Sequence, residues 1–384
     1  IRANNNILRI NNVTSVLNRN LAIETQPFDV YNLDDSPKTS AELSKEDALR
    51  YFEQMSFIRK METAIGKMYT KKIIRGFCHL YSGEEAISVG LNAIMRPQDT
   101  VITSYRCHAW TYLMGDGLQP VIAELLGKKS GCSRGKGGSM HMYVKNFYGG
   151  NGIVGAHVPL GTGVALAHQY KKDDGICTTL FGDGASNQGQ VFEAYNIAKL
   201  LSLPVIYGIE NNNYAMGTSV VRSSAMKELY KKGNYVPGIR LDGMDVLAVR
   251  EACRFAFDYI KSGKGPIILE FLTYRYGGHS MSDPGTSYRT REEVEEVRKN
   301  RDPLKLLKDK VIGSGLVTED ELKQIDEKAK KAVKEATDKS VADTEIAAEE
   351  VAYDIYSNYK GKVKMVQWSK YLDHKNVGFK PINL

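Results

Sequence analysis

The chain has 384 residues, of which 42% are hydrophobic and 25% are charged. This length and composition suit a folded protein with a large buried core and exclude a disordered or fibrous chain. The net charge of +7 is spread along the chain in separated Lys-Lys pairs, so no basic stripe indicates nucleic-acid binding. No apolar run reaches the roughly 18 residues of a membrane span, so membrane insertion is not expected. The five cysteines lack CxxC or Cys/His spacing, which indicates reduced thiols in a reducing compartment.

The first 43 residues differ in composition from the rest of the chain. Residues 1–23 contain three arginines, no acidic residue and apolar residues at helical spacing. This composition predicts a mitochondrial transit segment, and the alternative is a disordered or partner-docking arm. Residues 24–43 are polar, include two prolines and predict an extended lead-in. A helix should then start at Ser44 and continue to about Lys71.

The next segments place polar side chains beside an expected strand. Residues 75–80 should be extended, a helix should cover 83–95, and a strand should cover 101–104. Tyr105 and Arg106 follow this strand directly. An arginine in this position can reach a diphosphate through charge-assisted hydrogen bonds, and a surface ion pair is the ordinary alternative.

The stretch 131–155 has an unusual composition, with eight glycines among methionine, histidine and aromatic residues. It is too long and irregular for a turn, and a glycine-dense loop inside a folded domain is usually functional. A mobile surface loop is the alternative, although the Met and aromatic side chains would make such a loop unusually apolar. A helix rich in glycine and alanine should begin at Pro159.

Residues 176–219 predict a strand, a crossover helix and a second, parallel strand. Asp183, between two glycines, ends the first strand, and the three asparagines 211–213 follow the second. Because the carboxyl ends of neighbouring parallel strands lie side by side, Asp183 and the asparagines should converge. Their oxygens are too few to cage a metal alone but suit Mg²⁺ that also binds the phosphate oxygens of a cofactor. The ordinary alternative is a tight turn and an Asn-rich loop.

A third buried strand is expected over 266–274, and it leads to a polar loop, 276–289, that carries His279 and Ser280. Together with the preceding units, this strand gives an α/β domain over residues 44–310. We expect a mostly parallel sheet with helices on both faces.

The remaining residues, 311–384, are largely charged and predict a helical C-terminal extension. Thr318 and Glu321 have the spacing of a capping box, which predicts a helix from there to about Lys339.

Several motifs extend this reading to a family. GDG followed by NN, with 26 residues between them, resembles the signature of thiamine diphosphate-dependent enzymes. The motifs RGFCHL, SYR, KGGSMHMYVKNFYGGNGIVGAHVPLGTG, YAMGTS and YRYGGHSMSDPGTSYRTREE follow the order found in alpha subunits of the pyruvate dehydrogenase first component. From about residue 44 to 310 the chain is similar to this family of 2-oxo acid dehydrogenase subunits. The resemblance implies the thiamine diphosphate-binding fold, with helical N- and C-terminal extensions.

The resemblance also implies a set of site residues, carried over by position. Asp183, Asn212 and the carbonyl of Tyr214 would hold Mg²⁺ on the diphosphate. His79 and His279 would be catalytic and face the substrate, although a lone histidine is more often structural. The implied cofactor site consists of Tyr105, Arg106, Val144, Gly152, Val154, Asp183, Gly184, Ala185, Asn212, Tyr214 and His279.

The implied activity is thiamine diphosphate-dependent oxidative decarboxylation of pyruvate and reductive acetylation of lipoamide, which feeds acetyl-CoA synthesis in the mitochondrial matrix. The family's glutamate that contacts the cofactor's aminopyrimidine belongs to a beta subunit, and this chain has no second glycine-turn half that could supply it. The resemblance therefore implies activity only in an α2β2 heterotetramer, attached to a dihydrolipoamide acetyltransferase core. The alternatives are an alpha subunit of a branched-chain 2-oxo acid or acetoin dehydrogenase and, from another class, a non-catalytic cofactor-binding scaffold.

Regulation is implied as well. Members of the family are phosphorylated by a dedicated kinase, and a phosphatase reverses the modification. The matching positions here are Ser280, with Ser287 and Ser219 as lesser candidates. Gly277, three residues before Ser280, departs from the family pattern, which has a histidine there.

Overall fold

The computed structural model of the protein describes residues 20–357, 359–366 and 369–377. Nearly all of the expected transit segment, residues 1–19, lies outside the described residues. None of the described helices combines the length and apolar character that a membrane crossing requires.

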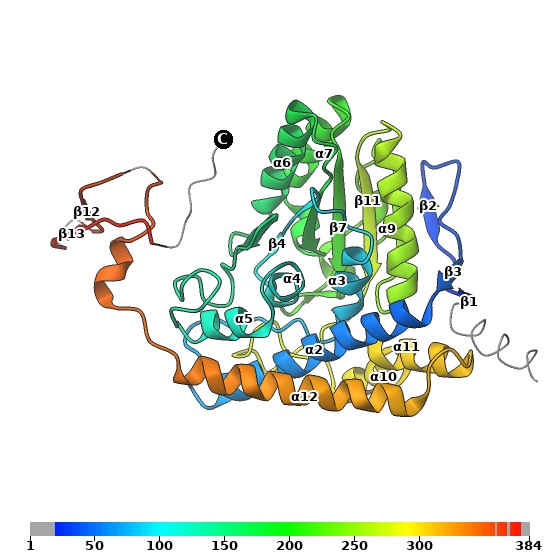
Figure 1. The fold of residues 1–384 in the computed structure, drawn as a ribbon. Coiled ribbons are helices and arrows are strands. Elements are labelled where there is room, and N and C mark those ends of the chain that lie inside the picture. The colour runs from blue at the N-terminus through cyan, green and yellow to red at the C-terminus, as the bar shows by residue number, and fades with distance from the viewer. Residues whose placement is uncertain (1–19, 358, 367–368, 378–384) are drawn as a thin grey trace, which may run out of the picture.

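A seven-stranded sheet forms the centre of the fold, in the order β2-β10-β11-β7-β6-β4-β5 (Figure 1). All neighbouring strands are parallel except β2, which pairs antiparallel with β10 at one edge. The predicted mostly parallel sheet is therefore confirmed. Its strands are β2 (Asp29–Tyr31), β10 (Gly238–Asp242), β11 (Ile267–Leu272), β7 (Val205–Asn211), β6 (Cys177–Gly182), β4 (Thr100–Ser104) and β5 (Phe147–Asn151).

Helices cover both faces of the sheet, as predicted (Figure 1). Side chains alternate along β6, so that Phe181 packs with α6 and α7, whereas Leu180 packs with α3 and α9. Strands buried on both faces need apolar side chains throughout, which explains the continuous apolar runs in the sequence. The covering helices are α6 (His157–Lys171), α7 (Gly189–Leu200), α3 (Glu85–Asn92) and α9 (Val246–Lys261).

A long helix, α2 (Lys45–Thr70), begins where the sequence predicts it, because the Ser44 hydroxyl accepts the Asp47 N–H at 3.1 Å. Two later helices, α11 (Pro303–Gly313) and α12 (Glu319–Ala342), pack against α2 along the lower side of Figure 1. The expected boundary after residue 310 thus falls inside α11, and helices on both sides of it share one packing surface.

The capping box of α12 is present as predicted. Thr318 accepts the Glu321 N–H, and the Glu321 carboxylate accepts the Thr318 N–H in return. This helix is exposed on most faces but buries one stripe against its neighbours, made of Leu322, Ala329, Val333, Ala336 and Ser340.

The two ends of the described chain contain short strands. β1 (Leu21–Glu24) forms where the expected transit segment meets the lead-in, and it pairs with β3 (Ser40–Leu43). The lead-in contains β3 and β2. Beyond α12 the chain forms a single-turn helix, η3 (Ala348–Ala352), and a hairpin that lies away from the sheet in Figure 1. The hairpin strands are β12 (Lys362–Lys364) and β13 (Tyr371–Asp373).

Short elements complete the fold. Four follow the central strands or connect them: η1 (Ala185–Asn187), β8 (Tyr214–Ala215), β9 (Thr218–Ser219) and η2 (Leu229–Lys231). The remaining helices are α4 (His108–Met114), α5 (Leu118–Leu125), α8 (Val220–Ser223) and α10 (Arg291–Arg301).

The glycine-rich stretch 131–155 is built into the domain. The buried Glu124 carboxylate accepts the N–H groups of four of its residues at 2.6–3.3 Å: Ser133, Gly135, Gly137 and Gly138. Further along, the stretch contributes β5, which lies at the free edge of β4. Met142 and Phe147 are buried, whereas Tyr148 and Ile153 remain exposed. The stretch is thus an ordered part of the fold with an apolar outer surface.

Candidate active site

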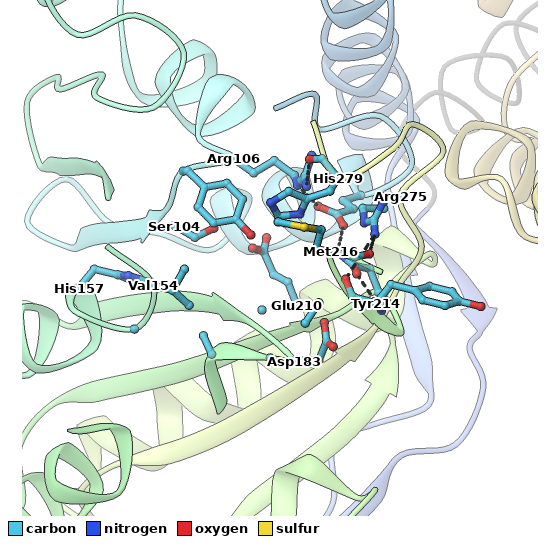
Figure 2. A pocket seen from close by; sticks show the side chains of 18 residues that line it. Ser104, Arg106, Val154, His157, Asp183, Glu210, Tyr214, Met216, Arg275 and His279 are labelled. Carbon is cyan, nitrogen blue, oxygen red and sulfur yellow. Dashed lines mark hydrogen bonds and ion pairs between the residues drawn. The ribbon is translucent and has the colours of Figure 1, made fainter. Parts of the chain in front are cut away.

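A cavity of about 350 Å³ opens at the carboxyl ends of four adjacent strands (Figure 2). Ser104 ends β4, Asp183 follows β6, Asn212 follows β7, and Arg275 lies shortly after β11. Ligands of open α/β sheets bind at this edge, because the loops that follow parallel strands converge there. The predicted meeting of Asp183 and Asn212 is present at the same cavity.

Three side chains that line the cavity carry a buried polar atom without a hydrogen-bond partner. These atoms are Asp183 Oδ2, His157 Nδ1 and Arg275 Nε. Buried polar atoms are rarely left unpaired, because each loses its hydration without compensation. Three such atoms around one cavity indicate a polar ligand.

The donor set at the strand ends fits a magnesium ion that shares its shell with a phosphate. Burial raises the pKa of Asp183 to about 6, and a cation nearby would favour its charged form. Asn212 donates its side-chain N–H to Glu84 at 2.9 Å, which fixes the orientation of the amide oxygen. Among the described residues, no group of three or more His, Cys, Asp or Glu side chains could hold a metal. Mg²⁺ typically keeps water or phosphate oxygens in its shell, which a few protein oxygens would complete.

Close backbone approach is possible beside Asp183. A Cβ atom at Gly184 would collide with Ala215, so a glycine is required at this position. Ala185 follows and begins η1 at the edge of the cavity. The turn thus brings its main chain directly to the wall where a phosphate would lie.

Arg106 is buried and cross-links three segments, so it is not a surface ion pair. Its Nη1 donates to the carbonyl of Leu80, its Nη2 donates to the carbonyl of His279 at 3.1 Å, and its Nε lies 3.6 Å from Glu84. Arg106 therefore holds the wall of the cavity together as well as supplying positive charge to it.

Three rings pack beside Arg106. The ring centroids of His79 and Tyr105 are 4.4 Å apart, and those of Tyr105 and His279 are 5.4 Å apart. Tyr105 and His279 line the cavity, whereas His79 lies behind them and donates from Nδ1 to the His279 carbonyl at 2.9 Å. Burial, with Arg106 as the next cause, lowers the pKa of His79 to about 3 and that of His279 to about 4. Both rings are therefore neutral near pH 7.

Sequence reasoning missed two buried acids in the cavity wall. Glu84 lies next to Arg106 and Asn212, and Glu210 accepts a hydrogen bond from the Tyr81 hydroxyl at 2.7 Å. Burial raises the pKa of both carboxyl groups, that of Glu210 to about 8. The signal for Glu210 was available, because a glutamate inside an otherwise apolar strand needs a specific reason.

Arg275 was also missed. It is almost fully buried, donates to the Met216 carbonyl at 2.5 Å and lies 3.5 Å from the Tyr214 carbonyl. Its position in the sequence, just after the third core strand, could have indicated that Arg275 lies at the ligand-binding edge of the sheet.

The structure brings most of the expected cofactor residues to the cavity. Its lining includes Tyr105, Arg106, Val154, Asp183, Gly184, Ala185, Asn212, Tyr214 and His279. Val144 and Gly152 lie outside this lining, with Val144 bridged to Phe147 and packed near Gly115.

A parallel sheet with a GDG aspartate and an asparagine at one cavity is the arrangement of a thiamine diphosphate-dependent enzyme. Residues 53–349 match the model of the dehydrogenase E1 component, and the chain belongs to this thiamine diphosphate-dependent family.

Curated relatives agree with this assignment. The chain is 57% identical over 335 residues to pyruvate dehydrogenase E1 component subunit alpha type II, mitochondrial, of Ascaris suum, covering 87% of this chain and 86% of that protein. A probable mitochondrial alpha subunit of Caenorhabditis elegans is 57% identical over 338 residues, covering 88% and 85%. The human somatic-form alpha subunit is 53% identical over 347 residues, 89% of each chain. The family resemblance in the sequence is therefore confirmed.

Proposed function

We propose that this chain is the alpha subunit of the pyruvate dehydrogenase component of a mitochondrial matrix complex, with thiamine diphosphate and Mg²⁺ as cofactors. The observation that carries the proposal is the unpaired Asp183 oxygen at a cavity shared with Asn212 and Arg275. The names of the relatives, at 53–57% identity over most of both chains, support pyruvate as the substrate.

When bound, thiamine diphosphate supplies a nucleophilic carbon and an electron sink for decarboxylation of a 2-oxo acid. The residues of this chain bind the cofactor and orient it toward the substrate. Asp183, Asn212 and the Tyr214 carbonyl would hold Mg²⁺ on the diphosphate, and the main chain at Gly184, which lines the cavity, would lie beside the phosphate. The neutral His279 ring, packed on Tyr105, offers hydrogen bonding at the cavity wall without adding a charge.

The partners are a beta subunit in an α2β2 heterotetramer, a dihydrolipoamide acetyltransferase core, and a regulatory kinase and phosphatase. Exposed apolar side chains on neighbouring helices support the proposal that a beta subunit docks on this chain. Leu160 and Tyr170 on α6 and Leu200 on α7 are 54%, 87% and 77% exposed. Ile153, in the glycine-rich stretch just before α6, is 72% exposed. Several large apolar side chains exposed on neighbouring elements are typical of a protein–protein interface.

We expect Gly163→Arg to prevent assembly without harming the fold. Gly163 lies on the exposed side of α6, and a Cβ there would meet nothing within 4 Å. Replacing a helical glycine should stabilise the isolated chain by up to about 1 kcal/mol, while the bulky cation would block a docked partner. The measurement is co-purification with a tagged beta subunit, together with thermal unfolding of the alpha chain.

Gly313→Arg is the matched control, because Gly313 is also an exposed helical glycine with open space around it, but on α11. This control should assemble normally. A fully assembled and active Gly163→Arg enzyme would place the beta subunit on another face.

The substrate is tested with the co-expressed heterotetramer. Pyruvate-dependent reduction of an artificial acceptor should exceed that with 3-methyl-2-oxobutanoate by about 10–200-fold in kcat/KM, as expected for a pocket fitted to the smaller side chain. Preference for the branched substrate, or for acetoin, would assign the chain to the corresponding dehydrogenase. Mg²⁺-dependent cofactor binding without turnover would instead indicate a scaffold subunit.

A further inference from the structure

A chain of three buried polar side chains lies behind the ring cluster of His79, Tyr105 and His279. Glu62 comes from α2, His108 is the first residue of α4, and Ser139 comes from the glycine-rich stretch. The exposed fractions of the first two are 0% and that of Ser139 is 5%. None of the three lines the cofactor cavity.

The hydrogen bonds in this chain run in one direction. Both Glu62 carboxylate oxygens lie 3.1 Å from His108 Nδ1, so this nitrogen carries the proton. In the tautomer that this contact assigns, His108 Nε2 accepts the Ser139 hydroxyl at 2.8 Å. The Ser139 oxygen in turn accepts the main-chain N–H of His79 at 3.1 Å.

The other end of the chain returns to the same segment. Glu62 Oε1 accepts the main-chain N–H of Tyr81 at 3.1 Å. Residues 79–81 belong to no helix or strand, so no ladder satisfies these two buried N–H groups. Leaving either N–H group unpaired in the interior would destabilise the segment. Side chains from three separate elements therefore replace the missing secondary structure.

The segment held in this way also carries the neighbouring loop. Met281 N–H donates to the Cys78 carbonyl at 2.8 Å, and Tyr276 N–H donates to the Ser82 carbonyl at 3.0 Å. Together with the bond from His79 Nδ1 to the His279 carbonyl, these contacts fix loop 276–281 against segment 78–82. A shift of residues 79–81 would move His279 at the cavity wall.

We propose that Glu62, His108 and Ser139 are positioning residues that hold His79, and through it His279, in the geometry needed for turnover. An acid, a histidine and a serine in this order also form nucleophilic triads. Here the Ser139 oxygen is buried and hydrogen-bonded to both His79 N–H and His108 Nε2, so it is not placed to act as a nucleophile. The inference rests on the proposed function, in which His79 and His279 serve the substrate end of the site.

The test uses Ser139→Ala in the assembled enzyme. It should lower kcat by about 10–100-fold, as expected for a small misplacement of reacting groups, and leave thiamine diphosphate affinity within about twofold. Ser56→Ala is the matched control, because Ser56 is also buried but its hydroxyl has no partner. This control should keep wild-type turnover. Ser139→Thr, which retains the hydroxyl, should recover most of kcat.

A double-mutant cycle separates positioning from general damage. If Ser139 acts through His79, then Ser139→Ala should cost little further activity in a His79→Ala background. Losses that multiply in the double variant, or a wild-type kcat for Ser139→Ala, would overturn the proposal.

Hydrogen exchange tests the same inference without turnover. The main-chain amides of residues 79 and 81 should exchange about tenfold faster or more in Ser139→Ala, and unchanged in Ser56→Ala. Unchanged exchange in Ser139→Ala would overturn the positioning role. The wild-type heterotetramer could show this exchange difference and still fail to turn over pyruvate. In that case the proposed substrate is wrong, but the three side chains still hold segment 79–81.

Discussion

Replacing Asp183 with alanine should abolish Mg²⁺-dependent binding of thiamine diphosphate and leave the fold intact. Asp183 lies just beyond β6 rather than in the core, and one of its buried oxygens has no partner among the described residues. Losing a metal ligand should weaken cofactor binding beyond the about 10–100-fold typical of outer-shell partners. Calorimetric titration with and without Mg²⁺ measures this loss, and thermal unfolding checks the fold.

Asn212→Ala should have the same effect on binding and an additional cost in stability. The variant removes the hydrogen bond to Glu84 and leaves that buried carboxyl group with fewer partners, at about 1–3 kcal/mol. Asn213→Ala is the control, since Asn213 is the exposed neighbour in the same cluster. Wild-type cofactor affinity in either Asp183→Ala or Asn212→Ala would refute the metal site.

The sequence predicted the central unit well because its signals are local. The apolar runs 176–181 and 205–209 and the helical periodicity over 190–201 lie within one or two residues of the observed bounds of β6, β7 and α7. Convergence of Asp183 and Asn212 follows from a single rule about parallel strand ends, so it needed no knowledge of distant contacts.

Elements that depend on tertiary context could not be read in the same way. β5 has the sequence FYGGN, and its glycines disfavour a strand; it forms because β4 offers an open edge. β2 is a three-residue, largely exposed strand stabilised by pairing with β10. Such short segments take their structure from the neighbour they meet.

The contacts of the cavity wall were likewise hidden. Arg106 meets Leu80 and Glu84 in one segment and His279 in a loop far along the chain, and no spacing rule joins these contacts. The position of His79 behind His279, rather than at the cavity surface, follows from the same network.

Asp283 adds three hydrogen bonds within the loop that carries Ser280. Asp283 accepts the His279 N–H at 2.6 Å, the Gly285 N–H at 2.8 Å and the Tyr288 hydroxyl at 2.5 Å. Ser280 is 7% exposed, and its hydroxyl lies 2.8 Å from that of Ser282. Because Ser280 is largely buried, we expect that a phosphate on it would require the loop to open.

The other family positions differ in exposure. Ser287, in the same loop, is exposed, and Ser219 is partly buried at the start of α8. Gly277 leaves open space where a Cβ would be, so the departure from histidine there does not reflect close packing. Its main-chain carbonyl accepts hydrogen bonds from Arg275 and Arg289. The carbonyl of a histidine at position 277 could accept the same two hydrogen bonds.

Ser280→Glu should therefore switch off the assembled enzyme while leaving cofactor binding measurable. Phosphorylation adds about −1.5 to −2 charges, and glutamate mimics part of this change. A negative charge beside Asp283 and His279 should open the loop and repel a carboxylate-bearing substrate. Two unit charges 4 Å apart near a protein surface repel each other by about 4 kcal/mol. If half of this energy, about 2 kcal/mol, opposes substrate binding and turnover, the rate should fall roughly 30-fold.

Steady-state turnover and cofactor titration measure the two effects separately. Ser280→Ala should stay active and resist inactivation by the proposed kinase. Thr286→Glu is the charge control, because Thr286 is exposed in the same loop and should tolerate the carboxylate with turnover near wild type. A fully active Ser280→Glu enzyme would contradict the charge mechanism, and equal losses in Thr286→Glu would show that any added charge in this loop suffices. Only a loss confined to Ser280 ties the switch to the buried hydroxyl next to His279.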